Sequence, residues 1–124
     1  MTEDRLLGWL EALMAHPSPT GVEGYIQGFL ASVLREMGFE VVLDSVLPGR
    51  PNLYALRGKP RYVVATHVDT VPVWGHRAGA GLAVRDGMAY GRGVVDPKGQ
   101  IAALLTALEG ASAPAFVALF VDVE

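Results

Sequence analysis

The spacing of apolar residues changes near Gly38, and this change restricts the folds available to the chain. Before Gly38, apolar side chains recur three or four residues apart, which predicts one helix over residues 6–14 and a second over residues 22–37. Prolines at positions 17 and 19 end the first helix, because a proline excludes the preceding residue from the α region. After Gly38 the pattern becomes strand-like.

The second helix carries signals at both ends. Thr20 and Glu23 have the spacing of a capping box, and Gly38 suits the position just after the C-terminal cap. The stripe predicted to be buried consists of Val22, Tyr25, Ile26, Phe29, Leu30, Val33, Leu34 and Met37.

Short apolar runs bounded by Gly and Pro predict strands over residues 39–43, 53–56, 61–66 and 115–121. The run Tyr62–Ala65 is apolar without alternation, as in a strand covered on both faces. A hairpin is predicted to turn through Arg85-Asp86-Gly87. A third helix, following Asp96, has a predicted core face of Ile101, Leu104, Leu105 and Leu108.

Helices that alternate with buried strands predict an α/β fold. We expect a partial three-layer sandwich, with a mostly parallel sheet and helices on its faces. With 124 residues, of which 51% are hydrophobic, the chain can bury one core, so we expect a single domain over residues 1–124.

Composition excludes several classes of function. The net charge is −3 and the ten Lys and Arg residues are scattered, so we expect no binding to nucleic acid or to acidic membranes. Without cysteine, any metal must be held by His and carboxylates. No apolar run reaches the ~18 residues of a membrane span, and Glu3 and Asp4 stand where a signal peptide would be basic. We therefore expect a soluble, cytoplasmic protein.

Polar residues cluster where the predicted strands end. His67, Asp69, Asp96 and Glu124 lie at C-terminal strand ends or in the following loops, where open α/β sheets place their ligand sites. In an extended segment, side chains two residues apart share a face, so Asp69 can accept a ring N–H of His67 and orient it toward a metal. The same pair can alternatively be a hydrogen-bonded strand end without function. Asp96 can likewise be a helix N-cap, with Pro97 at the first helical position.

Two longer motifs contain these residues. Thr66-His67-Val68-Asp69-Thr70-Val71-Pro72 and Tyr90-Gly91-Arg92-Gly93-Val94-Val95-Asp96-Pro97-Lys98-Gly99 resemble the paired signatures of a co-catalytic zinc family. That family includes acetylornithine deacetylase, succinyl-diaminopimelate desuccinylase, aminoacylase, glutamate carboxypeptidase and lysine-biosynthesis hydrolases. Residues 16–21 with Glu23 also resemble its N-terminal helix-turn-helix segment, so the resemblance extends over essentially the whole chain.

The resemblance implies roles for each residue. His67 would ligate one of two zinc ions, Asp69 would orient His67, and Asp96 would bridge both ions. Co²⁺ or Mn²⁺ would suit the same His and carboxylate ligands. The family also implies a cis peptide bond between Asp96 and Pro97, which costs only about 0.5–1 kcal/mol before proline.

The chain departs from the family near Glu124. Members carry an acidic triplet there, which gives a general base and then a ligand of the second metal. If Glu124 is the ligand, Val123 stands at the base position and cannot accept a proton. If Glu124 comes earlier in the motif, the ligand lies beyond it. A later carboxylate, a C-terminal His and an inserted dimerisation domain are also absent, so we expect the N-terminal portion of a catalytic domain.

Two functions remain open. The resemblance implies metal-dependent amide hydrolysis, acting on an N-acyl amino acid such as an acetylornithine-like substrate or on a small peptide. Asp69 and Glu124 are its candidate catalytic residues; His67, Asp96 and Glu124 are its candidate metal ligands. Alternatively, the chain is a non-catalytic domain for binding or assembly with at most a weak metal site. A chain without the family's C-terminal portion would expose surface that this portion normally covers, so we also expect a homo-oligomer.

Overall fold

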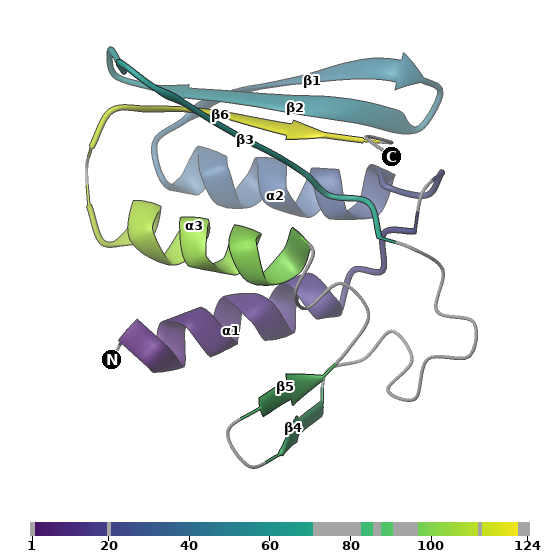
Figure 1. Ribbon diagram of the computed structural model, residues 1–124. Coiled ribbons are helices and arrows are strands. Elements are labelled where there is room, and N and C mark those ends of the chain that lie inside the picture. The colour runs from purple at the N-terminus through teal and green to yellow at the C-terminus, as the bar shows by residue number, and fades with distance from the viewer. Residues whose placement is uncertain are drawn as a thin grey trace.

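The computed structural model describes residues 2–19, 21–70, 83–85, 88–90, 97–111 and 113–121. Within these ranges three helices pack beside a four-stranded sheet, and a hairpin forms a second, two-stranded sheet (Figure 1). The elements are α1 (Thr2–Met14), α2 (Gly24–Glu36), β1 (Glu40–Leu47), β2 (Arg50–Arg57), β3 (Val63–His67), β4 (Ala83–Arg85), β5 (Met88–Tyr90), α3 (Gly99–Glu109) and β6 (Ala115–Phe120).

The four-stranded sheet is mixed, with the order β1-β2-β6-β3. β1 and β2 are antiparallel, β2 and β6 are antiparallel, and only β6 and β3 are parallel. Leu47 pairs with Arg50, so β1 and β2 are joined by a two-residue turn, which is too short for a parallel crossover. Gly49 adopts a φ of 73° in that turn. The α/β class is confirmed, but the prediction of a mostly parallel sheet is wrong for the described strands.

All three described helices lie on the same side of the four-stranded sheet (Figure 1). α2 packs against β1 and β2, while α1 packs against α3. Burying each large apolar side chain there contributes about 1.5–3 kcal/mol. The centre of the core consists of Leu13, Ile26, Leu30, Leu34, Leu53, Ile101, Leu105, Val117 and Leu119.

The α2 stripe is confirmed at its centre and wrong at its start. Val22 and Tyr25 are 51% and 77% exposed, because the chain enters the helix there on the solvent side. Gln27 is buried instead. Its side-chain amide donates to the carbonyls of Pro51 and Leu119 at 3.1 and 2.9 Å, so α2 is tied to β2 and β6 by hydrogen bonds.

The capping box at the start of α2 is wrong. Glu23 has helical backbone angles and makes no side-chain cap, since its carboxylate binds Arg50 on β2. Thr20 lies outside the described residues. A Cβ on Gly24 would come within 2.7 Å of the carbonyl oxygen of Gly49. The absence of a side chain at Gly24 therefore lets α2 begin directly against the β1–β2 turn.

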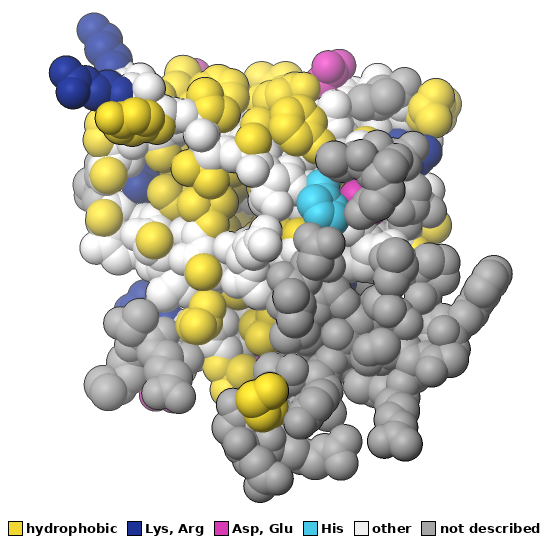
Figure 2. All heavy atoms as spheres, in the orientation of Figure 1, with side chains coloured by type: hydrophobic (Ala, Val, Ile, Leu, Met, Phe, Trp, Pro, Cys, Tyr) yellow, Lys and Arg dark blue, Asp and Glu magenta, His cyan; other side chains and the backbone are white. Residues whose placement is uncertain are grey.

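The prediction that residues 62–65 are covered on both faces is also wrong. Tyr62 and Val63 are 78% and 62% exposed. β3 is the last strand of the described sheet, and its outward face has no described helix over it. Figure 2 shows hydrophobic side chains gathered over that side of the sheet, at the top of the view. We call this surface the open face; from the strand register it comprises Val42, Tyr54, Leu56, Val63, Phe116 and Phe120.

The remaining predicted elements are confirmed. β4 and β5 form the expected antiparallel hairpin, and Ile101, Leu105 and Leu108 of α3 are buried. α3 begins at Gly99 after a wider, π-type turn at Pro97 and Lys98. Asp96 lies outside the described residues, as does the predicted cis bond that follows it. No helix in the described ranges is long and apolar enough to cross a membrane.

Candidate metal centre

The segment His67–Thr70 leaves the carboxyl end of β3 in a fixed path. His67 pairs with Phe120 at the end of β6, and the amide of Val68 donates to the Phe120 carbonyl at 2.9 Å. Val68 and Asp69 are fully buried and Thr70 is 5% exposed. The parallel pairing of β3 with β6 therefore brings this polar segment to the carboxyl edge of the sheet, as the sequence predicts.

His67 and Asp69 are in direct contact. Nδ1 of His67 lies 3.0 Å from Oδ1 of Asp69 and 3.1 Å from the Asp69 carbonyl oxygen. The Asp69 side chain is fully buried, while the His67 side chain is 16% exposed. Because both neighbouring oxygens are acceptors, the proton belongs on Nδ1, and the lone pair is then on Nε2. A carboxylate that holds the distal ring N–H in this way is the usual support of a metal-binding histidine, so the pair fits a zinc ligand.

The other two candidate ligands are carboxylates. Asp96 and Glu124 lie outside the described residues. Among the residues that are described, no group of three or more His, Asp or Glu side chains could hold a metal ion. The roles of Asp96 and Glu124 therefore stay predictions from the sequence.

Lys98 is a buried cation that sequence reasoning missed. It is 2% exposed, and its ammonium donates to the His16 carbonyl at 3.0 Å. Burial lowers the pKa of Lys98 to about 8. Its place two residues after Asp96, inside the quoted motif, is the only sequence signal that could have drawn attention to it.

Ser18 was also missed, because a lone serine without a nearby base carries no chemical signal. It is fully buried, and its hydroxyl donates to the carbonyl of Val68 at 2.6 Å. Its own carbonyl accepts the amide of Thr70 at 2.8 Å. Ser18 therefore contacts the chain on both sides of Asp69.

His16 and Trp9 are both partly buried and pack against other side chains of the protein. Nδ1 of His16 lies 2.8 Å from the Ala12 carbonyl, and its ring stacks on Phe29 at 4.4 Å between centroids. Trp9 packs against the core. His76 lies outside the described residues.

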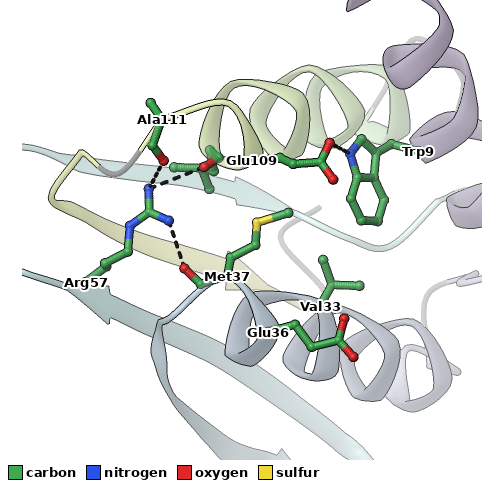
Figure 3. A pocket seen from close by; sticks show the side chains of 8 residues that line it. Trp9, Val33, Glu36, Met37, Arg57, Glu109 and Ala111 are labelled. Atoms are coloured by element: carbon green, nitrogen blue, oxygen red, sulfur yellow. Dashed lines mark hydrogen bonds between the residues drawn. The ribbon is translucent and has the colours of Figure 1, made fainter.

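A pocket of about 340 Å³, whose wall includes Trp9, lies away from His67 and Asp69. Figure 3 shows Arg57 in its wall, reaching to the end of α2 and to the segment after α3. The guanidinium donates to the carbonyls of Met37 and Ala111, both at 2.9 Å. It thereby supplies hydrogen bonds at the C-terminal ends of α2 and α3. Arg57 pairs with Ala115 at the start of β6, whereas His67 pairs with Phe120 at its end. The pocket is thus at the opposite edge of the sheet from the candidate centre.

This chain is similar to known proteins over most of its length. A sequence profile of the peptidase family M20/M25/M40 matches residues 63–117. The chain is 40% identical over 118 residues to a succinyl-diaminopimelate desuccinylase of Methylorubrum populi, covering 86% of this chain and 30% of that protein. A protein of the same description from Methylorubrum extorquens is 42% identical with the same coverage. The chain thus spans about 30% of the length of these relatives.

Solved structures agree with the fold. A tripeptidase from Staphylococcus aureus superposes with a TM-score of 0.78 at 27% identity, covering 96% of this chain and 36% of that one. Aminopeptidase PepT from Bacillus cereus gives a TM-score of 0.76 at 21% identity, with the same two coverages. This second likeness supports the fold alone. This chain therefore matches the fold of 36% of each of those longer chains.

Proposed function

Because this chain belongs to the peptidase family M20/M25/M40, we propose that it forms the N-terminal portion of the catalytic domain of a metal-dependent amide hydrolase. The observation that carries the proposal is the buried Asp69 carboxylate on Nδ1 of His67. Ligands beyond His67, Asp96 and Glu124 would come from the part of the family fold that this chain does not span.

The substrate class we propose is an N-acyl amino acid. The relatives at 40% and 42% identity are described as succinyl-diaminopimelate desuccinylases, which favours an acylated amino acid over a peptide. An acetylornithine-like substrate belongs to the same chemical class, whereas the structural neighbour at 27% identity is described as a tripeptidase. A role in amino-acid biosynthesis and a cytoplasmic location go with this proposal.

The residues of this chain would each have a defined task. His67 would bind one zinc through Nε2, and Asp69 would keep the proton on Nδ1. Asp96 would bridge two zinc ions, and Glu124 would act as a ligand or as the proton acceptor. What bound zinc supplies in such sites is polarisation of the scissile carbonyl and activation of water near neutral pH.

Asp69→Asn tests the orienting role. An amide can present its NH₂ toward Nδ1 and favour the wrong tautomer, so zinc affinity is expected to fall by about 10–100-fold. Calorimetric titration with zinc measures this, and Asp44→Asn on exposed β1 is the matched control. Equal affinities in the wild type and Asp69→Asn would show that Asp69 does not support a metal ligand.

The open face supports the second candidate, a domain for assembly. Val42 and Val63 on this surface are 61% and 62% exposed, and β3 presents a strand edge beside it. Apolar strand edges of this kind pair with other chains, so we propose a homo-oligomer formed through this surface.

Sedimentation velocity tests this assembly. The sedimentation coefficient of the wild type is expected to rise with concentration, and a Val42→Lys/Val63→Lys variant should remain monomeric. Tyr25→Lys, on the helical side and also exposed, is the control and should associate like the wild type. A wild type that stays monomeric at high concentration would contradict the proposal.

A further inference from the structure

The connection between α1 and α2 touches two segments that are distant in the sequence. Ser18 binds Val68, 50 residues away, and Lys98 binds the His16 carbonyl, 82 residues away. Pro19 also forms an isolated parallel bridge with Thr70. We call the residues His16–Pro19 the brace.

Each contact of the brace lies within two residues of His67, Asp69 or Asp96. Val68 stands between His67 and Asp69 in the sequence, and Lys98 follows Asp96 by two residues. The brace therefore contacts both ligand-bearing segments.

We propose that Ser18 and Lys98 are positioning residues, through which the brace sets the His67–Asp69 segment and the start of α3 relative to one another. The inference rests on the proposed function, because it assigns these contacts to the metal centre.

The Ser18 contact holds Asp69 from both sides. The hydroxyl of Ser18 binds the Val68 carbonyl at 2.6 Å, and its carbonyl binds the Thr70 amide at 2.8 Å. These two bonds restrain the peptide units before and after Asp69, and hence the direction of its carboxylate toward Nδ1 of His67. Pro17 and Pro19 flank Ser18 and fix its neighbours' φ angles, so the brace itself is stiff.

The Lys98 contact restrains the other segment. Burying the Lys98 ammonium costs desolvation free energy, and an aliphatic side chain could fill the same buried space without that cost. The ammonium adds a hydrogen bond of 3.0 Å to the brace, which fixes the turn that leads into α3. A shift of about 1 Å between catalytic groups can cost on the order of 100-fold in rate. Restraining the turn before α3 therefore affects activity.

Two variants test the inference with two readouts. Ser18→Ala removes the hydroxyl, and Lys98→Met removes the ammonium at similar length; Ser32→Ala is the control, since its hydroxyl binds Gly28 at an exposed position. Zinc affinity, measured by calorimetry, is expected to fall about tenfold or more in both variants and to stay unchanged in the control. In zinc-free Ser18→Ala, hydrogen exchange at the Thr70 amide should accelerate at least tenfold, and the ¹⁵N shifts of the His67 ring should move toward a mixture of tautomers.

The outcomes separate the inference from the proposed function. Wild-type affinity in both variants, together with an unchanged Thr70 amide and His67 ring in Ser18→Ala, would overturn the inference and leave the metal centre standing. If the wild type binds no zinc, the proposed function fails, and the zinc-free readouts decide alone. A changed His67 ring in Ser18→Ala would then support the bracing, whereas an unchanged ring would overturn it. Lys98→Met supplies the affinity measurement if Ser18→Ala does not fold.

Discussion

His67→Ala is expected to abolish measurable zinc binding to this chain while leaving the fold intact. Loss of an orienting partner alone costs about 10–100-fold in metal affinity, and loss of the ligand atom should cost more. The side chain of His67 stands at the end of β3 and is partly exposed, so its removal leaves the core unchanged. Calorimetric titration gives the affinity, and circular dichroism checks the fold.

Thr66→Ala is the matched control for this experiment. Thr66 precedes His67 on β3 and pairs with Leu119, so its side chain points to the other face of the sheet. It should bind zinc as the wild type does. Unchanged zinc binding in His67→Ala would remove His67 from the metal centre.

Glu23→Gln is expected to destabilise the protein by about 3 kcal/mol, the lower end of the range for breaking a buried ion pair. Both carboxylate oxygens of Glu23 bind Arg50, at 2.9 and 3.0 Å, and the Glu23 side chain is fully buried. The amide keeps the size of the side chain but removes the negative charge that Arg50 faces. Because the Arg50 side chain is 16% exposed, water offsets part of the loss. Urea unfolding measures the change.

The same carboxylate makes stability depend on pH. Burial raises the pKa of Glu23, but the hydrogen bonds from Arg50 and from the backbone amides of Gly21 and Glu23 outweigh it, so the pKa lies below its ordinary value. Its contribution is therefore complete above the unfolded pKa of about 4.3 and is lost as the pH falls through the lower folded value. The wild type should lose more stability than Glu23→Gln on acidification below about pH 4.3.

Glu109→Gln is the control for the ion pair. Glu109 binds Arg5 at 2.7 Å on the surface, where the two side chains are 33% and 58% exposed. Such pairs contribute at most about 1 kcal/mol. Equal losses of stability in Glu23→Gln and Glu109→Gln would show that the buried ion pair contributes no more to the free energy of unfolding than the surface pair.

Local patterns were enough to predict the elements but not their surroundings. The helical stripe and the apolar runs located α2, β3 and β6, because side-chain period depends on neighbours in sequence. Whether β3 is covered depends on which strands and helices lie beside it, and no local pattern carries that information. Glu23 likewise has the spacing of a cap, yet it binds Arg50, 27 residues away.

In the candidate centre, contacts between residues close in sequence could be predicted, whereas contacts between distant residues could not. The contact between His67 and Asp69 follows from two residues in one extended segment, so their spacing alone predicts it. Ser18 and Lys98 reach partners 50 and 82 residues away through backbone carbonyls. A carbonyl acceptor is present at every residue, so such contacts leave no mark in the sequence of the partner.

Anomalous diffraction at the zinc absorption edge, from crystals of this chain grown with zinc, tests the metal centre most directly. We expect a zinc peak about 2.0–2.1 Å from Nε2 of His67, with Asp69 still holding Nδ1. A zinc peak on other residues, or none at His67, would contradict the assignment of this chain as part of a zinc-dependent hydrolase.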